Sequence, residues 1–401
     1  MKILIVHNVY QQRGGEDAVV EAESRLLEDN GHTVILYRRH NDELRRRKMI
    51  GAFSTAVGTV WATDSYRALS LLLMREKPQV AHFHNTLPLV SPAGYYACCA
   101  AGVPVVQTLH NYRLLCPAAT FLRNGRICEL CLGHRFAWPS VVHACYRHSR
   151  PSSAAVAGML WIHRFMRTWA TKVNLYVALS EFARRKFIQG GFASDRLVVK
   201  PNFVHNDPGA RSVRGDYAFF AGRHSEAKGL SVLIRAWSNL RVQVPLRIAG
   251  DGPLRAEIEQ QVLQRKLTNI SFLGFLPEEE TRRQMSGARF LIVPSLWFEG
   301  FPMVIAEAFA LGVPVVCSRL GSLEEIVEDH KTGLHFEPDN ADDLSTKIEW
   351  LWTHGEESEE MGKAARRQFE ARFSARQGLE NQMQIYNQAI KNSQHGGLSS
   401  R

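Results

Sequence analysis

Short apolar segments alternate with helical patterns twice along this chain, and this alternation constrains the fold more than any other feature. The strands predicted in the first half are 3–6, 33–37, 80–83, 103–108 and 175–179. Those predicted in the second half are 217–221, 246–249, 270–273, 290–293 and 315–317. Strands separated by helices predict parallel sheets with right-handed crossovers. The predicted fold class is therefore α/β with two doubly wound sheets, and ligands are expected beyond the carboxyl ends of the strands.

The length of 401 residues favours two or three domains. We predict a first domain over 1–200 with an inserted segment at 113–150, and a second domain over 201–375. The linker is expected at 201–215, where proline and glycine recur. A final helical segment occupies 376–401.

The charge of the chain is unevenly divided. Residues 1–200 carry a net charge of +13 and the remainder −3, and segment 113–167 holds eight arginines against one acid, Glu129. A basic face of this kind attracts phosphates or anionic lipid. Without a nucleic-acid-binding motif it does not indicate a DNA or RNA partner. The first residues resemble a strand more than a signal peptide, and no run approaches the ~18–20 apolar residues of a spanning helix. We therefore expect a cytoplasmic protein, at most peripheral on the inner face of a membrane.

Residues 294–308 contain the most informative local pattern. An apolar strand ends in Pro-Ser, Glu299 follows, and the sequence Gly300-Phe301-Pro302 leads into an apolar helix that carries Glu307. Backbone N–H groups at 301–303 would face an anion at the helix start. One carboxylate could accept from sugar hydroxyls and the other from a ribose, as a nucleotide-sugar site requires. The spacing alone is more typical of a strand–loop–helix with two exposed glutamates.

Further motifs extend this pattern over nearly the whole chain. They are Gly14-Gly15, Thr108-Leu109-His110-Asn111, Lys200-Pro201-Asn202, Ala221-Gly222-Arg223 with Lys228-Gly229, Ala249-Gly250-Asp251-Gly252-Pro253 and Phe272-Leu273-Gly274. In this order they resemble the retaining glycosyltransferases of family 4, also called glycosyl transferases group 1. The resemblance implies the GT-B fold, with two Rossmann-like domains facing an interdomain cleft. It also implies an acceptor-side first domain, a donor-binding second domain, and a last helix that returns to the first domain.

The resemblance also implies roles for individual residues. The expected catalytic residues are Arg223, Lys228, Glu299 and His110. The expected donor-binding residues are Gly15, Gly222, Gly252, Gly274, Phe301, Pro302, Met303 and Glu307. His84 and Asn111 are expected on the acceptor side.

Two of these roles have physical support in the residue types. Arg223 and Lys228 can hold a leaving diphosphate, Arg in bidentate fashion and Lys as a point charge. As a neutral imidazole, His110 can donate to a sugar oxygen. His82 and His84 are expected to point in different directions, with only one facing the cleft. Glu16 and Asp17 are interpreted as structural residues at the start of a helix.

The chain contains no Asp-x-Asp sequence, which metal-dependent transferases commonly use to bind the donor. We therefore expect metal-independent transfer, with no cofactor required. The predicted reaction moves a sugar from a nucleoside-diphosphate-sugar to a glycan or lipid-linked acceptor in polysaccharide or glycoconjugate biosynthesis. The alternatives are a nucleotide-sugar epimerase on the same scaffold and a non-enzymatic, zinc-stapled polyanion-binding protein.

Four cysteines fall close together in the inserted segment: Cys116, Cys128, Cys131 and Cys145. One Cys-x₂-Cys pair in a reducing compartment favours a metal over disulfides. Structural zinc and simple buried thiols both fit this pattern. Residues 154–171 then place aromatic side chains beside Arg164 and Arg167, which suits either an interfacial helix on anionic lipid or a core helix with an exposed basic edge.

Overall fold

The computed structural model describes residues 1–11, 14–43, 57–213 and 215–396. Contacts divide the chain into two compact units. Unit 1 comprises Met1–Phe121, Cys128–His205 and Ala375–Arg401, and unit 2 comprises Leu122–Ile127 and Asn206–Ser374. Unit 1 thus includes the final segment of the chain, and its N-terminal part ends at His205.

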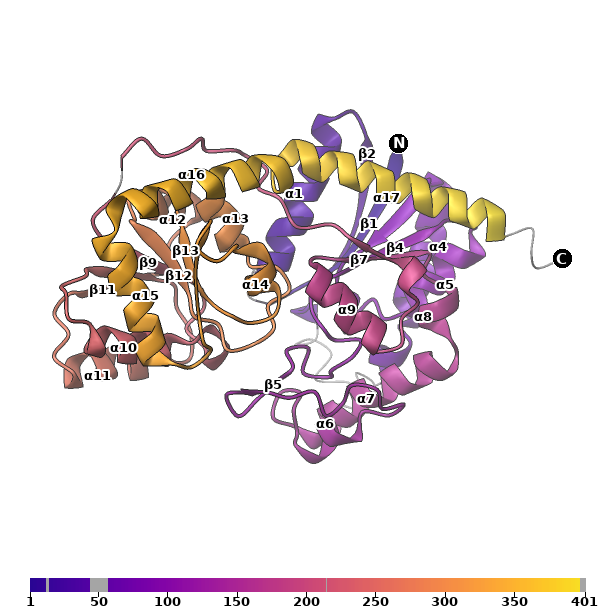
Figure 1. Ribbon diagram of the computed structural model, residues 1–401. Helices are drawn as coiled ribbons and strands as arrows, with labels where there is room; N and C mark the ends of the chain where they lie inside the picture. The colour runs from indigo at the N-terminus through magenta and orange to yellow at the C-terminus, as the bar shows by residue number, and fades with distance from the viewer. Residues whose placement is uncertain (12–13, 44–56, 214, 397–401) are drawn as a thin grey trace. The chain divides into compact units, whose positions relative to one another are not determined.

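Unit 1 is built on a six-stranded sheet in the order β2-β1-β3-β4-β7-β8, and all its neighbouring strands pair in parallel (Figure 1). The strands are β1 (Lys2–Val9), β2 (Thr33–His40), β3 (Val80–Phe83), β4 (Val105–Leu109), β7 (Leu175–Ala178) and β8 (Leu197–Val199). The helices are α1 (Gly15–Asp29), α4 (Thr63–Glu76), α5 (Ala93–Ala100), α6 (Trp138–Val142), α7 (Arg150–Phe165), α8 (Thr168–Thr171), α9 (Glu181–Gln189), the 3₁₀ turn η2 (Ser194–Arg196) and α17 (Ala375–Gly396).

Unit 2 has a second six-stranded parallel sheet, in the order β11-β10-β9-β12-β13-β14. Its strands are β9 (Ala218–Ala221), β10 (Leu246–Ala249), β11 (Ile270–Gly274), β12 (Phe290–Val293), β13 (Val315–Ser318) and β14 (Gly333–Phe336). Its helices are the 3₁₀ turn η3 (Glu226–Lys228), α10 (Leu230–Asn239), α11 (Arg255–Gln264), α12 (Glu278–Ser286), α13 (Met303–Ala310), α14 (Ser322–Ile326), α15 (Ala341–Thr353) and α16 (Gly355–Arg372). A small antiparallel hairpin, β5 (Leu122–Arg123) with β6 (Arg126–Ile127), completes the strands.

The prediction of an α/β fold with two parallel sheets is confirmed. The central strands carry near-continuous apolar runs because helices cover both faces of a parallel sheet. In β1, for example, six consecutive residues are buried. The prediction from sequence did not include the helices α5, α6, α9, α14, α15 and α16 or the strands β8 and β14. Of these helices, α6 and α14 have only five residues each, too few to show a helical period. In the described part of the chain, no helix has the length and apolar character needed to cross a bilayer.

Helix α17 packs against α1, β3 and β4 of unit 1 (Figure 1). Its apolar side, Ile385, Tyr386 and Ala389, belongs to the same core as Ile3 and Ile5 of β1. The end of the chain therefore contributes to the core around the first strand, so unit 1 is assembled from distant parts of the sequence.

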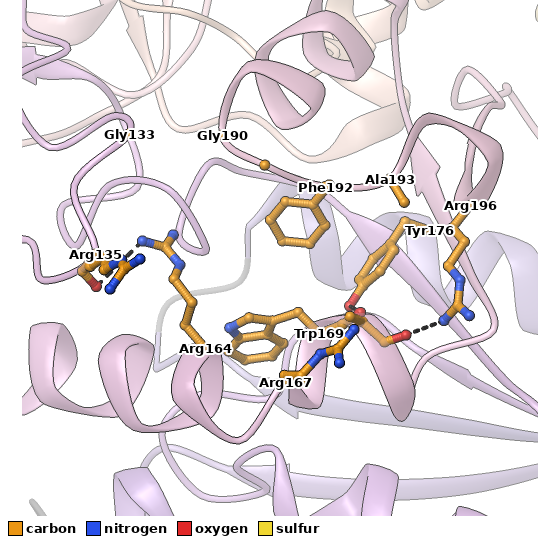
Figure 2. A pocket seen from close by; sticks show the side chains of 12 residues that line it. Gly133, Arg135, Arg164, Arg167, Trp169, Tyr176, Gly190, Phe192, Ala193 and Arg196 are labelled. Atoms are coloured by element: carbon orange, nitrogen blue, oxygen red, sulfur yellow. Dashed lines mark hydrogen bonds between the residues drawn. The ribbon is translucent and has the colours of Figure 1, made fainter.

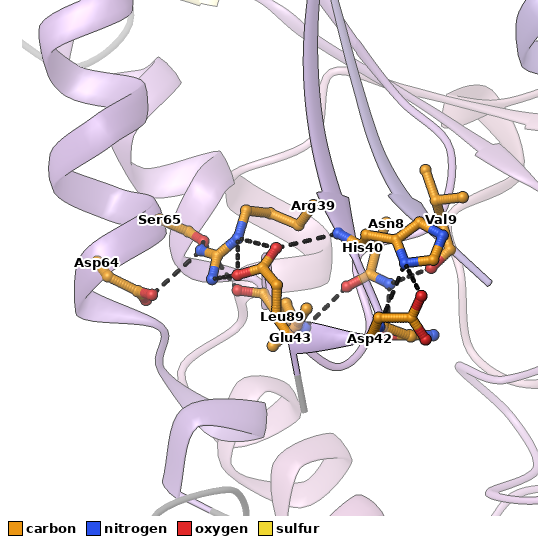
Figure 3. A network of polar contacts seen from close by, with 10 residues as sticks. Asn8, Val9, Arg39, His40, Asp42, Glu43, Asp64, Ser65 and Leu89 are labelled. Atoms are coloured by element: carbon orange, nitrogen blue, oxygen red, sulfur yellow. Dashed lines mark hydrogen bonds and ion pairs between the residues drawn. The ribbon is translucent and has the colours of Figure 1, made fainter. Parts of the chain in front are cut away.

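A polar network fixes the carboxyl ends of β1 and β2 (Figure 3). Arg39 donates to Glu43 and to Ser65 Oγ, and Ser65 Oγ donates in turn to the carbonyl of Leu89. The N–H of Leu89 donates to Asn8 Oδ1 at 2.9 Å. These bonds join the ends of two strands to α4, and so hold the sheet edge near which the polar residues of unit 1 gather.

A buried ion pair links α1 to the residue that follows β8. Lys200 Nζ lies 2.5 Å from Glu23 Oε1, and both side chains are almost fully buried. Burial alone would raise the pKa of Glu23, but the charge of Lys200 and neighbouring groups hold this pKa below its ordinary value. A buried pair of this kind is costly to break, because removing one partner leaves the other charge without compensation.

Replacing Lys200 with Met is expected to lower the free energy of unfolding by about 3–5 kcal/mol. The double variant E23Q/K200M should recover part of that loss, because it removes the stranded carboxylate. Lys2→Met is the matched control, since the Lys2–Glu76 pair is far more exposed and should contribute at most about 1 kcal/mol. Urea unfolding measures all three variants. Equal, small losses for K200M and K2M would contradict the assignment of Lys200 and Glu23 as a stabilising pair.

Candidate active site

The loop after β9 lies against the loop after β12. Gly229 adopts φ 69° at the start of α10, and a Cβ there would lie only 1.8 Å from the carbonyl oxygen of Pro294. The N–H of Leu296 donates to the carbonyl of Ala227 at 2.9 Å. This close backbone approach brings Lys228 beside the segment that carries Glu299.

Lys228 and Glu299 form an ion pair at this place. Nζ of Lys228 lies 2.6 Å from Oε1 of Glu299, and Ser295 Oγ donates to the same oxygen at 2.7 Å. Ser322 Oγ donates to the backbone carbonyl of Glu299. The Lys228 side chain is 26% exposed but that of Glu299 only 6%. The carboxylate is thus held in place, and the ammonium is the accessible half of the pair, available to an anion.

Arg223 lies two residues after the end of β9 and is exposed. Among the contacts of the described residues it makes no ion pair, so the structure does not join it to Lys228 and Glu299. A Cβ on Gly222 would lie 4.0 Å from Cδ of Lys228, which places this glycine beside the lysine stem.

Glu307 occupies the second turn of α13. Its pKa is raised from the ordinary value of 4.5 to about 7, first by burial and then by the charge of Glu278. The helix begins at Met303, with Pro302 at the N-cap. Phe301 is buried and its ring packs edge-on against Phe373, with the centroids 5.3 Å apart. The side chain of Phe301 is therefore part of the core, and only its backbone is left for a ligand.

Gly252 and Gly274 both adopt positive φ, 159° and 69°. A Cβ on Gly252 would lie 2.5 Å from the carbonyl oxygen of His224, so glycine is required there for packing. These positions are explained by the backbone of unit 2, and their contact with a donor stays a prediction.

His224 was missed from the sequence. It is buried, and neither ring nitrogen makes a hydrogen bond of regular geometry within the described structure, although the backbone of Ala249 lies near enough to influence its pKa. Burial lowers its pKa, so the ring is held neutral. It lies between Arg223 and the glycine loop after β10, where a Cβ on Gly250 would also approach it. The sequence analysis selected the adjacent Arg223 because of its charge. A buried neutral histidine has no characteristic sequence pattern, so His224 was not selected.

In unit 1, three histidines and one carboxylate gather where β1, β3 and β4 end. His84 Nδ1 lies 2.9 Å from His110 Nε2, and His84 Nε2 lies 3.4 Å from Glu23 Oε2. His82 approaches the same carboxylate oxygen at 3.6 Å. The expectation that His82 and His84 point in different directions is therefore wrong, since side chains two residues apart in an extended segment share a face.

Both ring nitrogens of His82 make hydrogen bonds within the protein. Its Nε2 lies 2.7 Å from Thr108 Oγ1, and its Nδ1 lies 2.9 Å from the hydroxyl of Tyr386 on α17. Burial and the charge of Lys200 hold its pKa well below the ordinary value. His82 therefore anchors α17 and has a structural role.

The contacts of His84 determine which nitrogen of His110 is available. Burial lowers the pKa of both rings, so both are neutral. His84 Nε2 and Glu23 Oε2 form no hydrogen bond at 3.4 Å, but the negative charge of the ionised carboxylate favours the His84 proton on the facing Nε2. His84 Nδ1 then accepts from His110 Nε2–H, which leaves a lone pair on His110 Nδ1. His110 is therefore arranged to accept a hydrogen bond from a hydroxyl, whereas the sequence suggested a donor.

Glu23 was also missed, although the sequence contained a signal. It lies on α1 at helical spacing from the buried Val19, Val20 and Leu27. A carboxylate on the apolar face of a helix requires a buried partner.

The start of α1 contains Gly15 and two acids. Gly15 is the first helical residue, and a Cβ there would meet nothing within 4 Å. Asp17 accepts from the N–H of Gly14 and bonds His7, while Glu16 accepts from Asn111 Nδ2 at 2.7 Å. The amide of Asn111 is thus engaged by the protein, and its acceptor-side role stays a prediction.

The four cysteines of the insert, Cys116, Cys128, Cys131 and Cys145, are free thiols. The pKa of Cys131 is raised to about 12 by burial and by the nearby thiols of the other three, so the four lie in one neighbourhood. Among the described residues, three that could together hold a metal ion are Glu23, His82 and His84, whose possible ligand atoms lie within 4.8 Å of one another. There the ammonium of Lys200 already neutralises the carboxylate. Structural zinc at the cysteines stays a prediction.

Two doubly wound parallel sheets, one of them followed by a cation–carboxylate pair and a helix carrying a second carboxylate, define a protein of the GT-B class. Two family models match successive parts of the chain: Glycosyltransferase Family 4 over residues 13–207 and Glycosyl transferases group 1 over 207–368. The chain belongs to this family of GT-B glycosyltransferases.

Individual relatives agree with this placement. An uncharacterised glycosyltransferase of Methanocaldococcus jannaschii is 34% identical over 212 residues, 52% of this chain and 58% of that protein. O-antigen chain mannosyltransferase C of Escherichia coli is 30% identical over 179 residues, 44% of this chain and 48% of that protein. The chain thus spans about half the length of these curated relatives.

Solved structures share the fold over almost the full length. HepE of Anabaena, crystallised with UDP-glucose, gives a TM-score of 0.66 at 18% identity, covering 98% of each chain. Sucrose-phosphate synthase of Thermosynechococcus elongatus gives a TM-score of 0.70 at 16% identity, covering 97% of this chain and 99% of that one.

The raised pKa of Glu307 predicts a pH-dependent stability difference. Because the folded state holds this proton more tightly than the unfolded chain, ionisation opposes folding above about pH 4.5 and does so fully above about pH 7. Glu307→Gln removes that ionisation, so its stability relative to the unmodified protein should rise between pH 5 and pH 8. Thermal unfolding at the two pH values measures this difference. Glu279→Gln, on the exposed side of α12, is the control; a Glu307→Gln difference as flat as the control would show that Glu307 titrates normally.

Proposed function

We propose that this protein is a retaining glycosyltransferase. It moves a sugar from a nucleoside-diphosphate-sugar to a glycan or lipid-linked acceptor, in polysaccharide or glycoconjugate biosynthesis. The observation that carries the proposal is the Lys228–Glu299 pair, with its accessible ammonium and anchored carboxylate. It is supported by HepE, which was crystallised with UDP and with UDP-glucose, and by relatives named as O-antigen chain mannosyltransferases.

In this proposal unit 2 binds the donor. Lys228 exchanges its contact with Glu299 for an oxygen of the diphosphate, and Arg223 supplies a second cation. The open amides at the start of α13 favour the same anion. Charge placed in advance where a leaving group develops negative charge is usually the largest catalytic contribution, and losing one such donor costs on the order of 10²–10³ in rate. Since these groups carry the compensating charge, the transfer is proposed to need no divalent metal.

The two carboxylates take different hydroxyls. Glu299, released by Lys228 but still held by Ser295, accepts from hydroxyls of the donor sugar. Glu307 accepts from the ribose hydroxyls, and it can do so best when ionised. Because the pKa of Glu307 is about 7, the affinity of the protein for a nucleotide should fall as the pH drops below neutrality.

The reaction proposed is attack on the same face of the sugar. The bond between the anomeric carbon and the diphosphate oxygen breaks, and a bond from that carbon to the acceptor oxygen forms. The acceptor's proton passes to the leaving phosphate, so no protein nucleophile is needed. His110 accepts a hydrogen bond from a sugar hydroxyl through Nδ1, with His84 and Glu23 holding the ring in place.

Unit 1 is proposed to bind the acceptor at the cytoplasmic face of a membrane. Residues 1–200, which make up most of unit 1, carry the net charge of +13, and a surface of this sign is attracted to anionic lipid. Acceptors anchored in a membrane would be concentrated there.

Thermal unfolding with UDP, GDP, ADP and TDP, each without divalent metal and with EDTA, tests the donor site. A nucleotide that binds only the folded protein stabilises it, by about 2.7 kcal/mol at 100 times its Kd. One base should give a clear shift, and Glu307→Ala should abolish the shift while Glu279→Ala keeps it. No shift from any nucleotide, with the protein folded, would contradict the proposal. Once the donor is known, the anomeric configuration of the product, read by proton NMR, tests retention.

Gly15→Ala tests whether a ligand approaches the start of α1. Because the added methyl meets nothing within 4 Å, the protein should keep or gain about 0.4–1 kcal/mol of stability. If substrate lies against this backbone, the transfer rate should nevertheless fall at least tenfold. Gly158→Ala, in the middle of α7 and equally open, is the control for the change in stability. Full activity of Gly15→Ala would show that no substrate contacts this backbone and that Gly15 is only a turn residue.

A further inference from the structure

A basic pocket of about 450 Å³ lies within unit 1, and its lining includes none of the clustered histidines His82, His84 and His110 (Figure 2). Four arginines line it: Arg135, Arg164, Arg167 and Arg196. They come from the insert, the end of α7, the start of α8 and η2. No carboxylate lines the pocket, and within the described chain none lies at ion-pair distance from any of the four. The pocket therefore offers positive charge with no negative charge to balance it.

Two of these guanidinium groups are fixed by backbone carbonyls. Arg164 donates to the carbonyls of His134 and Arg135, and Arg196 donates to those of Ala170 and Val173. The bonds to Arg135 and Ala170 are drawn in Figure 2. Burial lowers the pKa of Arg164, and no acid offsets that effect. A half-buried cation held this way gains most from an anion that supplies the missing charge.

The pocket floor supplies one more donor. Trp169 is 8% exposed, and its indole N–H has no hydrogen-bond partner among the described residues. Figure 2 shows this indole beside Arg164, with the ring of Phe192 near it. A buried N–H left unpaired is rare and costs free energy unless a ligand accepts it. The polar side-chain groups facing this pocket are mostly donors, whereas Trp169, Tyr176 and Phe192 make its surface largely apolar.

The side chains next to Arg164 and Arg167 in the sequence, here called the apolar rim, are exposed and apolar. Phe165 is 80% exposed, and Trp161 and Met166 are each 46% exposed. The rings of Trp161 and Phe165 stack with centroids 6.1 Å apart. Apolar side chains next to arginines at the end of a helix are typical of a segment that lies in a membrane interface. A soluble anion would require the arginines but not this rim.

We propose that the pocket binds the phosphate of an anionic membrane lipid while the last turn of α7 inserts its apolar side chains among the lipid tails. The arginines and the Trp169 N–H hold the phosphate oxygens, and Trp161, Phe165 and Met166 contact the bilayer. This proposal rests on the proposed function in one respect: lipid binding by the pocket would bring the enzyme to the membrane that holds a lipid-linked acceptor. Lipid binding by the pocket does not depend on donor chemistry.

Vesicle co-sedimentation tests the proposal with the full chain. Vesicles of equal parts phosphatidylglycerol and phosphatidylcholine should bind the protein, and vesicles of phosphatidylcholine alone should bind it weakly. R164Q/R167Q should weaken binding to the anionic vesicles about 30-fold, on the basis of about 1 kcal/mol per cation at the surface. R167Q alone, at an exposed residue, should weaken it about fivefold, which guards against misfolding of the double variant. The matched control, R147Q/R150Q, removes the same charge from exposed positions outside the pocket and should lose markedly less affinity.

The apolar rim is tested separately. Phe165→Ser should weaken vesicle binding about tenfold, whereas Phe275→Ser, at an equally exposed phenylalanine of unit 2, should have no effect. Equal losses for the two arginine pairs would reveal diffuse attraction and overturn the pocket assignment. Stabilisation of the protein by inorganic phosphate without vesicle binding would assign the pocket to a soluble anion and overturn the lipid source.

The nucleotide-induced thermal shift separates this proposal from the transferase proposal. R164Q/R167Q should keep that shift in full. If the protein binds anionic vesicles through the pocket but no nucleotide stabilises it, the lipid-site proposal is kept and the transferase proposal is rejected. If a nucleotide stabilises it but anionic vesicles do not bind through the pocket, the transferase proposal is kept and the lipid-site proposal is rejected.

Discussion

The buried ion pair between Glu23 and Lys200 is the interaction on which the polar interior of unit 1 depends. It joins α1 to the residue after the last strand of the sheet, and its carboxylate also faces His82 and His84. Without Lys200, an ionised carboxylate would be buried beside neutral rings, and it would regain neutrality only by taking up a proton. The ion pair therefore keeps Glu23 ionised, and the charge of Glu23 favours, through His84, the arrangement in which His110 presents its Nδ1 lone pair. Stability and the orientation of the candidate catalytic histidine thus share one cause.

The two units hold their charges in comparable ways. In unit 2 the anchored member is Glu299, bound by Ser295 and by Lys228, and the accessible member is the ammonium. In unit 1 the anchored member is Glu23, and the group left for a ligand is the outer nitrogen of His110. In both cases a buried carboxylate fixes a second group, and that second group is the one placed to meet a ligand. Such an arrangement reduces the reorganisation needed when charge develops on a substrate.

The inserted segment and α7 show the opposite arrangement. Among the described residues, the pocket arginines Arg135, Arg164, Arg167 and Arg196 have no carboxylate partner, and the buried indole N–H of Trp169 has no hydrogen-bond partner. Large apolar side chains beside them in the sequence are exposed. Each feature is unfavourable in water alone, and an anionic lipid surface would compensate all three at once. The sequence had left two alternatives open for residues 154–171, a lipid-facing helix and a core helix. The structure contains both faces, because Met159 and Leu160 are buried while Trp161 and Phe165 are exposed.

The sequence by itself determined the α/β class and the two parallel sheets, because buried parallel strands are continuous apolar runs. It also drew attention to the polar residues in the loops after the strands, whose donor-binding roles stay predictions. Glu299 and Lys228 were found this way, although only the structure showed that they pair across 71 residues. Tertiary structure alone decided the partners of buried polar groups. Lys200 meets Glu23 over 177 residues and Tyr386 meets His82 over 304, and no periodic pattern encodes such distances. For the same reason, the acceptor character of His110, the common direction of His82 and His84, and the arginine pocket appeared only when distant segments were brought together by folding.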